Sequence, residues 1–155
     1  MNTQVLKIIA CAALATIGMT AQADSVESIS PAQLEQERGE RQAYRALLDR
    51  IMGREGRDAA WASEQEKQIR ATLDSVSKLD VSARNVECAR TMCRVILGHK
   101  TTTGQQEVLT ETAGRPGFTL PGQAHLEWSD EDGSAVTYIY LLRFDTDWPE
   151  VVAKE

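Results

Sequence analysis

Two cysteines five positions apart, Cys88 and Cys93, constrain the fold of this chain more than any other feature. Apolar residues alternate with other residues around them, which is typical of half-buried β-strands. A two-residue turn at Arg90-Thr91 would place the cysteines opposite each other in an antiparallel hairpin, with Cα atoms about 4.5 Å apart. A disulfide can span that distance, so the sequence predicts a disulfide-closed hairpin. Because Arg-Thr is not a favoured two-residue turn, a looser four-residue turn is an alternative.

The two thiols also allow a zinc site, with His99 as a further ligand, or a redox-active pair. A structural zinc site takes four ligands, and a catalytic dithiol usually has the C-x-x-C spacing at the start of a helix. The spacing C-x4-C between two strands fits neither pattern well, and an oxidising compartment favours a structural disulfide. We therefore expect neither a metal site nor a cofactor.

The N-terminal residues predict export. Lys7 precedes a mostly apolar run, and the small-x-small triplet that ends at Ala23 is a form that signal peptidase accepts. Residues 1–23 are thus expected to be a signal peptide, and the mature chain is expected to be periplasmic or secreted. An uncleaved anchor is an alternative, although the run is shorter than the about 20 apolar residues of a membrane span. A lipidated Cys11 is another, although the apolar stretch before it is only three residues long.

The charge of the chain limits its partners. The formal net charge is −6, and removal of residues 1–23 takes away one lysine and no acid. An acidic chain is not attracted to nucleic acid or to an anionic membrane surface, so neither is expected as a partner. After signal cleavage, no later segment is apolar and long enough to predict a membrane span.

The remaining pattern predicts one α+β domain over residues 24–155, with an N-terminal extension and helix over 24–53 and a core over 58–155. Helical and strand periodicities follow the order α-α-β-β-α-β-β. Helices are expected near 31–53, 58–79 and 103–113, and strands near 86–88, 93–97, 125–128 and 135–144. We predict helices packed on one face of a mainly antiparallel sheet of about four strands. The order of the strands cannot be derived from the sequence.

Local signals mark the ends of the first helix. Ser30, Pro31 and Gln33 have the spacing of a capping box with proline at the first helical position. Gly53 and Gly56 are expected to end this helix. Only its second half carries an apolar stripe, so only that half is expected to be buried.

The later elements carry weaker signals. The second helix has two candidate caps, Asp58 and the pair Ser63 and Glu66, and the third is expected to begin with a capping box of Thr103 and Gln106. The strand over 135–144 is apolar on both faces, which predicts a central position in the sheet.

Few residues suggest chemistry. His99 and His125 are the two histidines, and either could act as a general base. The sequence places no nucleophile beside them, so we assign no catalytic residue. Phe118 and Leu120 lie in a loop rich in proline and glycine. There they either fill the core or form an interaction loop for a partner.

The segment from Asp58 to His99 contains Trp61-Ala62 with Glu64 or Glu66, Ile69, Val86-Glu87-Cys88 and Cys93-Arg94-Val95. These residues form a Trp/Glu helix motif followed by a V-x-C-x(4)-C-R-V hairpin motif. With these two motifs the segment resembles a group of uncharacterised exported proteobacterial proteins. The resemblance implies a periplasmic or secreted location and carries no activity.

Two functions are compatible with these observations. The first is a non-enzymatic exported domain, stabilised by its disulfide, that binds an unknown protein or envelope component. The alternative is a small periplasmic hydrolase or redox enzyme that uses His99 or His125. The first is favoured because the sequence contains no recognisable reaction site.

Overall fold

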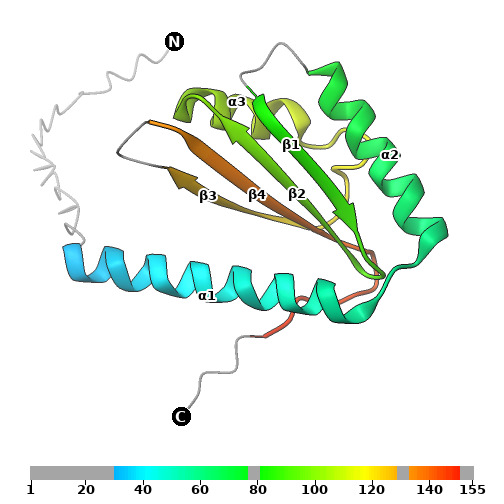
Figure 1. Cartoon of the computed structure of the whole chain (residues 1–155), viewed down its shortest axis with the longest axis horizontal. Helices are drawn as coiled ribbons and strands as arrows, with labels where there is room; N and C mark the ends of the chain where they lie inside the picture. The colour runs from blue at the N-terminus through cyan, green and yellow to red at the C-terminus, as the bar shows by residue number, and fades with distance from the viewer. Residues whose placement is uncertain (1–29, 77–80, 129–132, 151–155) are drawn as a thin grey trace, which may run out of the picture.

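The computed structural model describes residues 30–76, 81–128 and 133–150, in which three helices and four strands form. The predicted signal peptide, its cleavage site after Ala23 and Cys11 lie outside these residues. Figure 1 shows the arrangement. In chain order the elements are α1 (Pro31–Glu55), α2 (Ala59–Ser75), β1 (Val81–Cys88), β2 (Met92–His99), α3 (Thr102–Thr112), β3 (Gly122–Trp128) and β4 (Ala135–Leu142).

The strands form one antiparallel sheet with the spatial order β1-β2-β4-β3. The predicted α+β class and the element order α-α-β-β-α-β-β are confirmed. β4 lies between β2 and β3, as its two apolar faces predicted. β1 and β3 are the edge strands, and they have different surroundings.

The predicted hairpin register is confirmed. Cys88 lies opposite Cys93, with their Cα atoms 4.0 Å apart, and the two residues form a disulfide. The Ala89 amide donates a hydrogen bond to the Met92 carbonyl at 2.9 Å, which closes a two-residue turn. The tighter of the two turns considered for Arg90-Thr91 is therefore the one that forms.

A distant carboxylate stabilises this unfavourable turn. Glu55, the last residue of α1, accepts hydrogen bonds from the amides of Arg90 and Thr91, each at 3.2 Å, and from the Thr91 hydroxyl. Among the described residues, Asp145 is the only non-glycine residue with a positive φ, so the turn is not the favoured type I′. The end of α1 thus satisfies turn amides that would otherwise depend on solvent.

Two helices cover one face of the sheet. Ala62, Ile69 and Leu73 of α2 and Val108 of α3 are buried against the strands. The sheet contributes alternate residues of β1, β2 and β4 to this core, namely Val86, Cys88, Cys93, Val95, Leu97, Ile139 and Leu141. The disulfide is part of this apolar layer.

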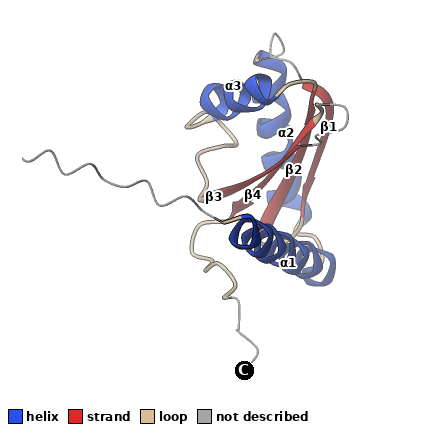
Figure 2. Cartoon of the chain, turned by 90° about the vertical axis from the view of Figure 1, so that its left-hand side faces the viewer, coloured by secondary structure: helices blue, strands red, loops and turns tan. Residues whose placement is uncertain are grey.

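The third helix lies on the opposite face. Leu48 and Met52 of α1 pack against Met92, Tyr140 and Leu142, which are the other set of alternating positions on β2 and β4. Figure 2 shows α1 and α3 on opposite sides of the sheet. The expected single helical face therefore holds for α2 and α3 only. α1 covers part of the second face because β4 has apolar side chains on both sides.

Polar contacts accompany this packing. The Tyr140 hydroxyl donates to Asp49 at 2.8 Å, and the Arg94 guanidinium donates to the same carboxylate oxygen at 2.8 Å. Arg94 also pairs with Glu87 at 2.7 Å. Burial, followed by the neighbouring Asp49, raises the pKa of Tyr140 above its usual value, so its hydroxyl remains a donor at neutral pH.

Most helix ends follow the predicted signals. Ser30 and Gln33 form the predicted capping box, and Asp58 rather than Ser63 caps α2. α1 continues through Gly53 and ends before Gly56, whose positive φ suits glycine. The predicted start of α3 is wrong by two positions, because Thr101 provides its cap.

All four strands differ in length from the prediction, and β2 covers Met92–His99 rather than 93–97. β1 and β3 begin earlier than expected, and β4 ends at Leu142 rather than at Phe144. Within the described ranges, no helix has the length and apolar character needed to cross a membrane.

We expect loss of the disulfide to lower stability by about 2 kcal/mol, since it closes a small loop in the unfolded chain. Urea unfolding of the Cys88→Ala/Cys93→Ala double variant measures this loss. The chain from Asp24 should show no reactive thiol when denatured without reductant. Two equivalents of thiol label would contradict the bond.

We expect Asp49→Ala to lower the free energy of unfolding by about 2 kcal/mol. The Tyr140 hydroxyl and Arg94 would lose their acceptor in a partly buried place. Asp74→Ala is the matched control, because Asp74 pairs with Arg84 while 77% of its side chain is exposed. The control should cost under about 0.5 kcal/mol in urea unfolding. Equal losses in both variants would contradict a docking role for Asp49.

Candidate functional site

A shallow groove lies between the first half of α1 and the edge strand β3. Its volume is about 210 Å³. The lining side chains come from one face of α1 and from the middle of β3, namely Arg38, Arg41, Gln42, Arg45, His125, Leu126 and Glu127. This concave site brings charged, titratable and apolar groups together.

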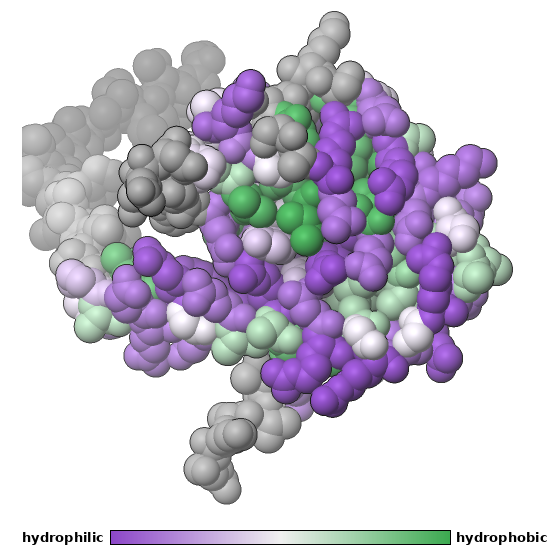
Figure 3. Space-filling model, in the orientation of Figure 1, coloured by the Kyte–Doolittle hydropathy of each residue, from purple (hydrophilic) through white to green (hydrophobic). Residues whose placement is uncertain are grey.

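The α1 side of the groove is a helix segment without a core. Every residue from 30 to 43 is exposed, and burial begins only at Tyr44. The capping box at Ser30 and local pairs along the helix, such as Glu37 with Arg41 at 3.4 Å, stabilise this segment without tertiary packing. The surface of this half is mostly hydrophilic (Figure 3). Arg38, Arg41 and Arg45 share one face of it because of their helical spacing.

Arg45 attaches the helix to the sheet at the inner end of the groove. Its guanidinium forms an ion pair with Glu127 of β3 at 2.6 Å and lies 4.1 Å from the centre of the Tyr138 ring. Burial lowers the pKa of Arg45, but the neighbouring charge of Glu127 outweighs it, so the pKa lies above its ordinary value. Arg45 therefore has a structural role, because Glu127 already balances its charge.

Arg38 and Arg41 make weaker contacts within the protein than Arg45 does. Within the described residues, their ion pairs are to Glu35 at 3.3 Å and Glu37 at 3.4 Å on the same exposed helix, and more than half of each arginine side chain is exposed. Exposed pairs of this kind contribute about 0–1 kcal/mol and exchange readily with another anion. These two guanidinium groups are therefore available to a ligand.

His125 forms part of the β3 side of the groove. Its ring lies between Tyr44, with centroids 6.1 Å apart, and Tyr140, at 5.7 Å in an edge-on arrangement. Burial, followed by the positive charge of Arg45, lowers its pKa below the ordinary 6.5. Among the described residues its Nε2 atom has no hydrogen-bond partner. His125 is therefore a neutral ring at pH 7.

The groove is positive on a negative chain. Its lining contains three arginines and one glutamate, whereas the whole chain has a formal charge of −6. A guanidinium group offers a planar pair of donors that matches a carboxylate or phosphate. The arrangement is suited to binding an anion with a flat face.

The two histidines do not form one site. His99 is 2% exposed, and its Nε2 lies 3.0 Å from the Thr137 hydroxyl on the sheet face covered by α2 and α3. His125 lies on the α1 face, beside Tyr140. A reaction that uses His99 would need access to a buried ring.

The predicted interaction loop packs inward. Phe118 and Leu120 are partly buried against the core formed by α2, α3 and the sheet. The Phe118 amide donates to the Arg115 carbonyl at 2.8 Å, and Gly117 approaches the backbone of Ile69 so closely that a Cβ atom would clash at 2.7 Å. The geometry favours the alternative in which these side chains fill the core.

The arginines of the groove are not among the residues that the sequence predicts to carry chemistry. The signal was present as Arg38, Arg41 and Arg45 at helical spacing. In the sequence alone, this spacing indicates a solvent-exposed helix face. Only the tertiary structure shows that β3 lies beside that face. In the described ranges, no group of three or more His, Cys, Asp or Glu residues could hold a metal ion.

Comparisons of the chain with protein-family models, curated proteins and solved structures gave no match.

We expect protonation of His125 to destabilise the fold. Its folded pKa is below the ordinary 6.5, so the unfolded chain takes up the proton first as the pH falls. Stability is therefore lost from about pH 7 downward, through the interval between the unfolded and folded pKa values. Urea unfolding at several pH values should show a steeper loss in the wild type than in His125→Gln. Parallel pH profiles would contradict the lowered pKa, since His99 and the carboxylates are common to both proteins.

Proposed function

We propose that this chain is an exported, disulfide-stabilised, non-enzymatic domain that binds an anionic segment of a protein or envelope component in the groove between α1 and β3. The observation that carries the proposal is the placement of Arg38 and Arg41. They lie on an unburied helix segment, and their partners are weak and local. A segment of this kind has no packing role that would explain two available cations facing a groove.

The composition of the groove supports binding rather than catalysis. Its available cations can hold an anion, while Glu127 is engaged with Arg45 and His125 lies between two tyrosine rings. General acid–base catalysis needs a proton acceptor within reach of a reacting group, and a nucleophile needs a base beside it. His125 is the residue on which an enzymatic alternative would rest, because His99 is buried.

The disulfide supports the proposed location. The Cys88–Cys93 bond lies in the core layer between the sheet and α2, where it forms part of the fold. Bonds of this kind persist in the periplasm and outside the cell, whereas the cytosol keeps thiols reduced. Export and cleavage after Ala23 are thus part of the proposal.

A charge-neutralising pair of variants tests the proposed function. The bait is the chain purified from the periplasm, and its mass shows whether it begins at Asp24. We expect Arg38→Gln/Arg41→Gln to weaken capture of envelope components at least about tenfold, since each lost charge-assisted contact is worth about 1.5–3 kcal/mol.

Arg50→Gln/Arg54→Gln is the matched control. Both residues are exposed on α1, on the side of the helix away from the groove, and the charge change is the same. The control should bind like the wild type. If both double variants lose capture equally, the binding reflects overall charge, and if neither does, the groove is not the site.

A further inference from the structure

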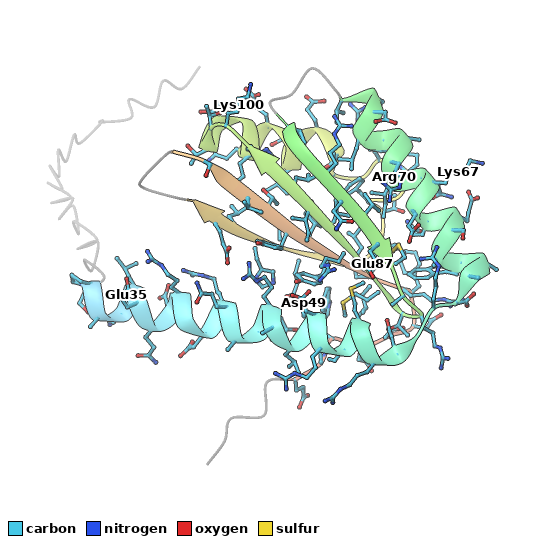
Figure 4. The ribbon with its side chains drawn as sticks, viewed as in Figure 1. Glu35, Asp49, Lys67, Arg70, Glu87 and Lys100 are labelled. Carbon is cyan, nitrogen blue, oxygen red and sulfur yellow. A yellow bond between two sulfur atoms is a disulfide. The ribbon has the colours of Figure 1, made fainter. Side chains whose placement is uncertain are left out.

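The two edges of the sheet differ in a way that points to the form of the ligand. Side chains of residues 57–70 cover the outward main chain of β1. Glu66 accepts from the Cys88 amide at 2.8 Å, Arg57 donates to the Cys88 carbonyl at 2.8 Å, and Arg70 donates to the Val86 carbonyl at 2.7 Å. Figure 4 shows Arg70 on α2 beside β1. This edge cannot accept another strand without losing these bonds.

The outward edge of β3 has no such cover. The Leu142 amide donates to the Pro121 carbonyl at 2.7 Å, which sets the alternation of the pairing between β3 and β4. By that alternation, the main-chain N–H and C=O groups point toward β4 at Gln123, His125 and Glu127. At Ala124 and Leu126 the main-chain N–H and C=O groups point outward, and within the described residues no hydrogen bond to them is found.

The available arginines lie beside this open edge. Leu126, His125 and Glu127 share the groove with Arg38 and Arg41. A chain that paired with β3 would therefore pass along the exposed cationic face of α1. Its main chain would satisfy the outward groups of Ala124 and Leu126, and acidic side chains on its α1 side would meet the two guanidinium groups.

We infer that the ligand of this groove is an extended acidic peptide segment that pairs with β3 as an additional strand. The inference rests on the proposed function and specifies the ligand. A second copy of this chain fits the edge less well. Antiparallel pairing of β3 with the β3 of another copy would place the arginines of both copies along one seam, and like charges repel there.

The probe is a blocked peptide of seven residues, the length of β3, in which glutamate and threonine alternate. Its dissociation constant is measured by calorimetry with the chain from Asp24. Two further peptides carry N-methyl groups on all threonines or on all glutamates, and their charge is unchanged. Residues opposite each other in an antiparallel pair share a face. With glutamates facing α1, the threonine amides therefore face β3.

We expect methylation of the threonine amides to weaken binding at least about tenfold and methylation of the glutamate amides to have little effect. If the peptide pairs with β3 in the parallel direction, methylation of the glutamate amides weakens binding and methylation of the threonine amides has little effect. That result also supports the inference. On the protein side, Leu126→Pro removes one outward donor, and Leu126→Thr retains it as a matched control. If Leu126→Pro does not fold, the methylated peptides decide the question.

Three outcomes would overturn the inference. If all three peptides bind equally and Arg38→Gln/Arg41→Gln weakens each of them, the groove binds acidic chains without strand pairing, and the proposed function survives. If the unmodified peptide does not bind, the ligand is not an acidic strand, and the capture experiment alone decides the proposed function. If the protein is a dimer that the peptide does not dissociate, a second copy occupies the edge.

Discussion

The candidate site depends on the docking of α1 through its second half alone. Leu48 and Met52 supply the apolar contact with the sheet, and Asp49 binds the Tyr140 hydroxyl at the same level. The first half has no apolar stripe, so it gains nothing by following the sheet and remains exposed. A helix that is anchored at one end and unburied at the other forms one wall of a groove against the nearest strand, β3.

Charged side chains on the two long helices serve opposite purposes. On α2, Glu66 and Arg70 are used within the domain, where they satisfy the main chain of edge strand β1. The hydrogen bond from Arg57 holds the pKa of Glu66 below its usual value, so this carboxylate stays ionised at neutral pH. On α1, the partners of Arg38 and Arg41 in the described part of the chain are local. The β1 edge of the sheet is therefore covered by side chains, whereas the β3 edge is open and lies beside the exposed guanidinium groups of Arg38 and Arg41.

The hairpin is an element that local sequence specifies. The register of Cys88 and Cys93 was predictable because the two strands of a hairpin are close in sequence. The position and length of the turn then fix which residues lie opposite each other. The tight turn itself was uncertain, because its stabilising group, Glu55, lies more than thirty positions away. The groove cannot be predicted from the sequence for the same reason. The arginine spacing on α1 was visible, but its neighbour β3 follows after two further helices and two strands.

The sequence by itself determined the capping box of α1, the register of the hairpin and its disulfide, the central position of β4 and the half of α1 that is buried. Each of these depends on residues within a few positions of one another or on the periodicity of a single element. Only the tertiary structure decided which face α1 covers, which edge α2 closes and which strand the arginines face. These arrangements involve segments that are far apart in the chain. The burial of apolar surface, rather than local propensity, decides which arrangement has the lower free energy.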